Sequence, residues 1–138
     1  MATHRVPATV EVQALLFALF GSANAFSGNL SLTEVFDGLV GPEFPHRATF
    51  FVYVKFRRVP ASFHFSLRLE DEEFGTILWS SPESACVAQP DQPLSLLAQA
   101  NVEFKGPKSY VMRAFVDGTE VWHEELPVKH LMTPAKTP

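Results

Sequence analysis

The chain has very little cysteine, and it lacks the long apolar runs that a membrane helix would need. Its 138 residues include one cysteine, Cys86, which excludes an intrachain disulfide and favours a reducing, cytoplasmic compartment. No apolar stretch of the sequence approaches the roughly 20 residues of a membrane span, so we expect no membrane partner. We interpret Cys86 as a small, partly buried apolar residue rather than a nucleophile.

Positive charge is also scarce. The chain has 11 Lys and Arg residues against 15 Asp and Glu, which gives a formal net charge of −4. The only basic cluster is formed by Lys55, Arg57 and Arg58. Because a nucleic-acid-binding surface needs a basic footprint, this composition argues against a nucleic-acid partner.

The usual signatures of catalysis, phosphate binding and metal binding are missing as well. There is no GxSxG elbow, GxGxxG loop or P-loop, and none of the histidines belongs to an HxH or HExxH grouping. The acidic run EDEE at 70–73 lacks the DxDxDG spacing of a calcium loop, so we interpret it as a solvated turn. The sequence therefore predicts no metal site and no cofactor, and it leans against an enzyme.

What the chain has in abundance is phenylalanine, in stretches that alternate between apolar and polar residues. The clearest stretch is SFHFSLRLE, where Phe63 and Phe65 share one face while His64 and Arg68 share the other. This period of two is typical of an antiparallel strand with one face on a core and one in water. The dipeptide at 117–118, Asp-Gly, lies between two such runs and predicts a tight hairpin.

Alternating stretches recur along the whole chain, with no convincing helical period, although 93–101 could form a helical turn. A proline-containing stretch, 81–93, has no clear period and is interpreted as a long loop. We expect an all-β fold, an antiparallel β-sandwich of seven or eight strands, with either immunoglobulin-like or jelly-roll-like topology. The expected strands are 10–20, 29–37, 48–58, 62–71, 75–80, 95–105, 109–117 and 119–128. The expected organisation is an N-terminal extension (1–9), a single domain (10–130) and a flexible C-terminal tail (131–138).

The first 25 residues carry some features of a secretory signal peptide. They include an early Arg5, the apolar run 15–20 and an Ala-Asn-Ala sequence. Glu11 and Gln13, at the edge of the apolar run, are atypical of such a signal. Secretion is therefore the alternative to a cytoplasmic location.

Two segments carry a resemblance to a known family. They are GNLSLTEVFDGLVGPEFP at 28–45 and SYVMRAFVDGTEVWHEELPV at 109–128. The chain resembles a family of uncharacterised bacterial β-sandwich proteins with a GxLxxxxVFDxxxxxxFP segment and a closing VDG hairpin, over roughly residues 11–129. Such proteins tend to have glycine where this chain has Glu34. The resemblance implies a bacterial origin and a sandwich fold, and it supplies no activity.

The hypothesis that the sequence favours is a non-catalytic interaction module. It would bind a protein partner, or a second copy in a homodimer, through a sheet face or an edge strand. Aromatic side chains that reach the surface together would mark the contact area. The candidate contact residues are Trp79, Trp122, Tyr53, His64 and His123.

The alternative hypothesis is a small enzyme or a ligand carrier with a site between the sheets or near the loop 81–93. It requires at least two ionisable side chains to meet beside a pocket. The candidates are His64, His123, Glu34, Asp37 and Arg68. Carbohydrate binding through Trp79 or Trp122 is a third possibility, which rests on fold-level analogy alone.

Overall fold

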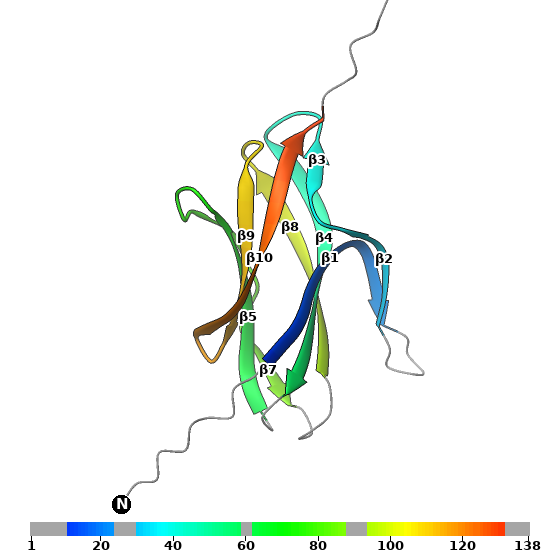
Figure 1. The fold of residues 1–138 in the computed structure, drawn as a ribbon, viewed down its shortest axis with the longest axis vertical. Coiled ribbons are helices and arrows are strands. Elements are labelled where there is room, and N and C mark those ends of the chain that lie inside the picture. Colours follow the sequence, from blue (N-terminus) through cyan, green and yellow to red (C-terminus); the bar gives the residue numbers. More distant parts are fainter. Residues whose placement is uncertain (1–10, 24–29, 59–61, 88–93, 132–138) are drawn as a thin grey trace, which may run out of the picture.

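The protein folds into two β-sheets packed face to face, and the described residues contain no helix (Figure 1). The structure is a computed structural model and describes residues 11–23, 30–58, 62–87 and 94–131. The expected extension 1–9 lies outside the described residues, as does nearly all of the expected tail. The all-β sandwich predicted from the sequence is confirmed.

One sheet has four strands, and all its neighbouring strands are antiparallel. Along the sheet they are β2 (Leu30–Phe36), β1 (Glu11–Ala23), β4 (His46–Arg58) and β8 (Leu94–Phe104). β1 pairs with β4 through its first half and with β2 through its second half. The β1–β2 pair therefore projects beyond the rest of the sheet, as Figure 1 shows.

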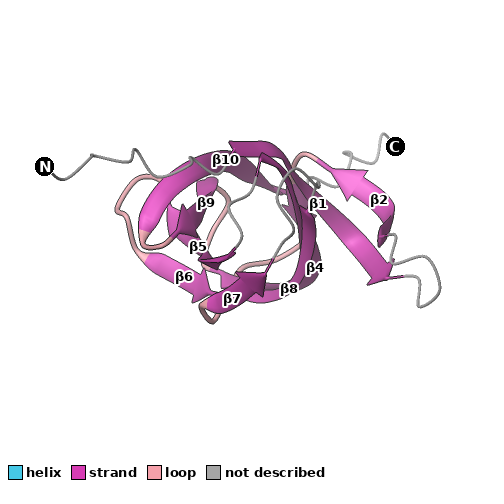
Figure 2. Ribbon diagram, turned by 90° about the horizontal axis from the view of Figure 1, so that it is seen from below, coloured by secondary structure: helices cyan, strands magenta, loops and turns pink. Residues whose placement is uncertain are grey.

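The other sheet has six strands. Along it lie β3 (Leu39–Gly41), β10 (Thr119–His130), β9 (Ser109–Val116), β5 (Ser62–Asp71) and β6 (Ile77–Ser80), with β7 (Ser84–Val87) pairing β5 on its own. β3 runs parallel to β10, and the other pairs are antiparallel. Seen from below in Figure 2, the two sheets curve toward each other around a common interior.

The order of the strands decides the topology that the sequence left open. β1, β4 and β8 take the places of strands A, B and E of an immunoglobulin-like sandwich, and β5, β9 and β10 take those of C, F and G. Near the start of β9, the Tyr110 hydroxyl donates to the Gly106 carbonyl at 2.8 Å. A tyrosine whose hydroxyl bonds back to the chain just before strand F is the tyrosine corner of these folds. The topology is therefore immunoglobulin-like.

The core is built from the alternating phenylalanines. Phe56 of β4 meets Phe63 and Phe65 of β5 with ring centroids 5.3 and 5.2 Å apart. Phe104 meets Tyr110 at 4.9 Å. These edge-to-face contacts join one sheet to the other, and all five side chains are buried. The face assignment made from the period of two is correct for these strands.

Two short strands were missed in the sequence. All eight expected strands are present, with small differences at their ends, and the described residues form ten strands in total. β3 has three residues and β7 has four, which is too short for a period of two to stand out. β7 lies in the stretch 81–93, so the interpretation of that whole stretch as a loop is wrong. The expected hairpin is confirmed, since Asp117 and Gly118 have φ of 50° and 81°.

Candidate functional site

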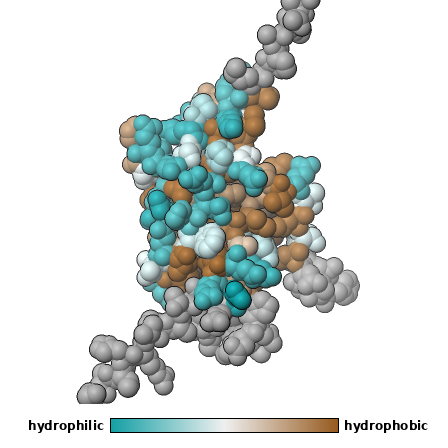
Figure 3. Space-filling model, viewed as in Figure 1, coloured by the Kyte–Doolittle hydropathy of each residue, from teal (hydrophilic) through white to brown (hydrophobic). Residues whose placement is uncertain are grey.

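The outer face of the four-stranded sheet carries exposed apolar side chains where β1 pairs with β2. Leu16, Phe20 and Val35 are 39%, 60% and 51% exposed. Val35 lies opposite Ala18, two residues along β1 from Leu16, so Leu16 and Val35 project from the same side of the strand pair, and Phe20 follows further along β1. Figure 3 shows hydrophobic surface gathered over β1 and β2. We call Leu16, Phe20 and Val35 the apolar face.

Uncharged side chains of β4 and β8 continue this surface. Phe51, Tyr53 and Leu97 are half-buried on the same outer side, and the Tyr53 hydroxyl lies 3.0 Å from Ser95 Oγ. A Cβ at Gly21 would lie 3.0 Å from both methyl groups of Leu97. The missing side chain therefore lets β1 approach β8 closely at Leu97.

The outer face of the six-stranded sheet is charged instead. Arg68 of β5 lies opposite Arg113 of β9, and the nearly buried Glu70 lies 2.7 Å from the Nε atoms of both. Arg113 also donates to Glu120 at 2.6 Å, and Arg68 stacks on the Phe115 ring at 4.6 Å. Hydrogen bonds to Glu120 and Glu70 raise the pKa of Arg113. The outer face of the four-stranded sheet also carries charges, the Arg47–Glu103 pair and Lys55, but they lie outside the apolar face.

The interpretation of the acidic run as a solvated turn is wrong for its first half. Glu70 and Asp71 are buried at the end of β5, and only the two glutamates that follow are exposed. Asp71 accepts from Lys108 Nζ at 2.7 Å and from the backbone N–H groups of Glu73 and Phe74. The hydrogen bond from Lys108 is the main cause that lowers the pKa of Asp71. Asp71 therefore stabilises the β5–β6 turn, whereas Glu70 pairs with Arg68 and Arg113.

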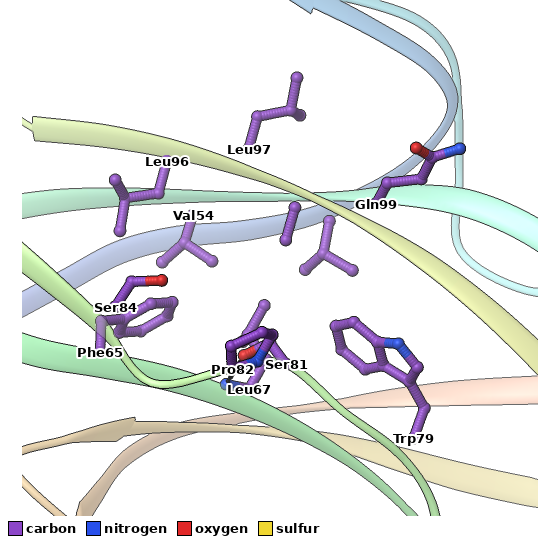
Figure 4. A pocket seen from close by; sticks show the side chains of 12 residues that line it. Val54, Phe65, Leu67, Trp79, Ser81, Pro82, Ser84, Leu96, Leu97 and Gln99 are labelled. Carbon is purple, nitrogen blue, oxygen red and sulfur yellow. Dashed lines mark hydrogen bonds between the residues drawn. The ribbon is translucent and has the colours of Figure 1, made fainter.

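A cavity of about 290 Å³ opens between the sheets, where β8 faces the β6–β7 edge. Trp79 projects into it, as Figure 4 shows. A second hollow, of about 310 Å³, lies between β1, β2 and β10, and Asp37 is part of its lining. Both are at sandwich edges, where the two sheets separate.

The five contact candidates from the sequence lie on different surfaces. Trp79 lines the cavity, and Trp122 is half-buried against the core, with its Nε1 donating to Glu124 at 3.4 Å. Tyr53 lies beside the apolar face. His64 and His123 are exposed on strands of the charged sheet. The structure does not gather these side chains into a single aromatic patch.

The five ionisable candidates of the alternative hypothesis are also dispersed. Within the described residues, no hydrogen bond or ion pair joins any two of them. His64 contacts Asp117, and Arg68 pairs with Glu70. Glu34 and His123 are exposed on β2 and β10, and Asp37 follows β2. The convergence that an enzyme site would require is not met by these five residues.

Two further observations concern reactive groups and membranes. Cys86 is buried and packed in the core, and burial raises the pKa of its thiol. The interpretation of Cys86 as a small apolar residue is confirmed, because the nucleophilic thiolate is disfavoured. Over the described ranges, no cluster of three His, Cys, Asp or Glu side chains could hold a metal ion, and no helix could cross a membrane.

The apolar face was missed although the sequence carries a signal for it. Residues 14–20 read ALLFALF, so apolar side chains occupy both faces of β1. A continuous apolar run in a strand indicates that neither face is solvated by polar side chains. The predicted strand 10–20 covers this run, but no exposed apolar face was expected from it.

Comparison with protein-family models and with curated proteins gives no match, so the family inferred from the two motifs stays a prediction. Among solved structures, the chain is similar to an alkylpurine DNA glycosylase from Pseudomonas fluorescens bound to DNA containing an abasic site analogue. The TM-score is 0.54 at 8% identity, over 87% of this chain and 30% of the glycosylase chain. The CARDB domain of a Pyrococcus furiosus protein in complex with di-metal ions gives a TM-score of 0.39 at 17% identity, over 89% of this chain and 99% of that domain. The glycosylase likeness shows the fold alone.

Proposed function

We propose that this protein is a non-catalytic β-sandwich interaction module, and that its apolar face docks on a second copy of the same chain. The observation that carries the proposal is the exposure of Leu16, Phe20 and Val35 on two paired strands. A cluster of large exposed apolar side chains marks a surface that is covered in the functional assembly.

The chemistry around the apolar face supports an interface. The cores of protein interfaces are depleted of charge and enriched in aromatic residues. Phe51, Tyr53 and Leu97 extend the surface without adding a charge. Phe20 is the most exposed of the three apolar-face residues, and a projecting aromatic side chain is the usual anchor of such a contact.

The choice of a second copy rests on charge and symmetry. A two-fold axis brings a surface against itself, so the surface must be compatible with its own copy. On the outer face of the other sheet the guanidinium groups of Arg68 and Arg113 are already paired with Glu70 and Glu120, so a contact there would remove ion pairs from water, whereas the apolar face buries uncharged side chains. In the described part of the chain, β2 is an edge strand, so two β2 strands can also pair antiparallel across the axis.

The test is the molar mass in solution, measured by sedimentation equilibrium from micromolar to millimolar concentration. We expect the wild type to dimerise and Phe20→Asp to weaken dimerisation at least tenfold, because a buried carboxylate would be unpaired at the centre of the contact. The matched control is Ile77→Asp on β6, where the side chain is 52% exposed on the other sheet. A wild type that stays monomeric, or a Phe20→Asp variant that dimerises like Ile77→Asp, contradicts the proposal.

The other functions considered from the sequence have less support. The ionisable candidates for catalysis lie apart, and the Trp79 ring projects into a cavity rather than lying flat on the surface as carbohydrate stacking would require.

A further inference from the structure

The cavity of about 290 Å³ lies between β8 and the β6–β7 segment. β8 is the last strand of the four-stranded sheet, at the edge away from β1 and β2, which carry the apolar face. Over the described residues, β8 pairs only with β4, so its other edge borders the opening. β6 and β7 are separated by residues 81–83, which turn the chain aside at this point. The opening therefore exists because the two sheets are not joined there.

The inner wall of the cavity consists of core residues. Val52, Val54 and Leu67 are almost fully buried, and they come from both sheets. Figure 4 shows Trp79 at one end of the cavity and Phe65 at the other, with Leu96 and Val54 on the facing side. A ligand bound in the cavity would contact apolar side chains on several sides.

The cavity is open to solvent at the edge of the sandwich, so its volume is that of a surface pocket rather than of a sealed void. An apolar cavity of about 150 Å³ is enough to bind benzene. At about 290 Å³, this cavity has room for an aromatic ring with a substituent.

The lining also limits the charge of a ligand. None of the residues that line the cavity is ionisable, so a charged group inside would lose its hydration without a partner. Ser81 Oγ accepts from the Leu67 backbone N–H at 2.7 Å, which leaves the Ser81 hydroxyl hydrogen available to donate. A hydrogen-bond acceptor on the ligand would therefore be satisfied there.

From this arrangement we propose that the cavity between β8 and β6–β7 binds a small neutral ligand with an aromatic or branched apolar body and one carbonyl-type acceptor. The body packs between Trp79, Phe65 and the valines of β4. The acceptor receives a hydrogen bond from Ser81. Leu97 lines the cavity and also borders the apolar face, but the proposed ligand contacts use neither Leu97 nor the apolar face, so this site does not depend on the proposed function.

The test compares two probes of the same size that differ in charge, acetophenone and benzoate. Each is titrated into the full chain while methyl NMR signals are followed. We expect acetophenone to shift the signals of Val52, Val54, Leu67 and Leu96 saturably, with a dissociation constant on the order of 10⁻⁴ to 10⁻³ M for so small a probe. The signal of Val128, on β10, should not move. Benzoate should bind at least tenfold more weakly.

Two variants fill or narrow the cavity. Ala98 lies in the wall of the cavity, so Ala98→Leu should weaken acetophenone binding at least tenfold. Ser84 lies at the opening, so Ser84→Leu should weaken binding while leaving the packing of the core unchanged. The matched control, Ala85→Leu, adds the same bulk on β7 outside the lining and should bind like the wild type.

Absence of saturable shifts at the cavity methyls overturns the proposal, as does equal binding by the wild type and both cavity variants. If Ala98→Leu does not fold, Ser84→Leu and the position of the shifts in the wild type still decide the outcome. Phe20→Asp should bind acetophenone normally, which separates this site from self-association.

Discussion

The two tyrosines of the chain offer a controlled test of the immunoglobulin-like topology. Each hydroxyl makes one hydrogen bond, Tyr110 to the Gly106 carbonyl at 2.8 Å and Tyr53 with Ser95 at 3.0 Å. Tyr110 is 1% exposed, whereas Tyr53 is half-buried at the surface. Replacing each by phenylalanine removes one oxygen atom and changes nothing else in the side chain.

The expected magnitude differs because of burial. In Tyr110→Phe the Gly106 carbonyl loses a donor that comes from an almost fully buried side chain, which should cost about 1–2 kcal/mol of unfolding free energy. In Tyr53→Phe water can replace the lost partner, so the loss should stay within about 0.5 kcal/mol. With a urea m-value of about 2 kcal/mol/M, the Tyr110→Phe midpoint should fall by roughly 0.5–1 M.

The assay is equilibrium urea unfolding of both variants and the wild type, followed by tryptophan fluorescence. The difference between the two midpoints is the informative quantity, since it cancels any general effect of removing a hydroxyl. If Tyr110→Phe loses no more stability than Tyr53→Phe, then Tyr110 does not hold the β8–β9 corner, and the tyrosine-corner interpretation is refuted.

Two further predictions concern backbone strain and pH. Glu34 has a φ of 57°, a conformation that costs any residue with a side chain about 1–2 kcal/mol. The Glu34→Gly variant should therefore be more stable than Glu34→Ala by about 1 kcal/mol in urea unfolding. Equal stabilities of the two variants would show that this φ is not strained. Asp71 has a folded-state pKa below its ordinary value of 3.8, because the hydrogen bond from Lys108 favours its charged form. The stability that Asp71 contributes to the folded state is therefore present above about pH 4, and it is lost as the pH falls through the folded-state pKa. The unfolding free energy of Asp71→Asn should therefore fall less steeply than that of the wild type between about pH 4 and pH 2, and parallel curves would contradict the role of this pair.

The strand pattern was predictable wherever a strand is long and one of its faces is wet. The stretch that contains Phe63 and Phe65 shows this, because each apolar residue on the core side is followed by a polar one. β3 and β7 were not predictable, since a strand of three or four residues is held by its neighbours rather than by its own pattern. The hairpin at Asp117 and Gly118 was predictable because its turn chemistry is local.

The conformation of Glu34 is a feature that only the structure revealed. Its φ is positive although it lies within β2, and glycine would adopt this conformation without steric cost. The observation concerns the backbone of β2 and says nothing of a catalytic role for this carboxylate.

The candidate sites were much less predictable than the strands. The cavity involves Trp79 and Ser81 of one sheet edge and Leu96 of the other, which lie in separate parts of the sequence. Its existence depends on the absence of a strand between those edges, and no local pattern encodes such a gap. Similarly, the pairing of Glu70 with Arg113 depends on the register between β5 and β9.

The sequence by itself determined that this protein is an all-β sandwich with a phenylalanine core, because alternation and turn chemistry act between neighbouring residues. It also determined which faces of the long strands point inward. Only the tertiary structure decided the immunoglobulin-like strand order, the exposure of Phe20 and Val35, and the cavity beside Trp79. These features depend on which strands become neighbours and which edges remain uncovered, and such long-range packing leaves no periodic signal in the chain.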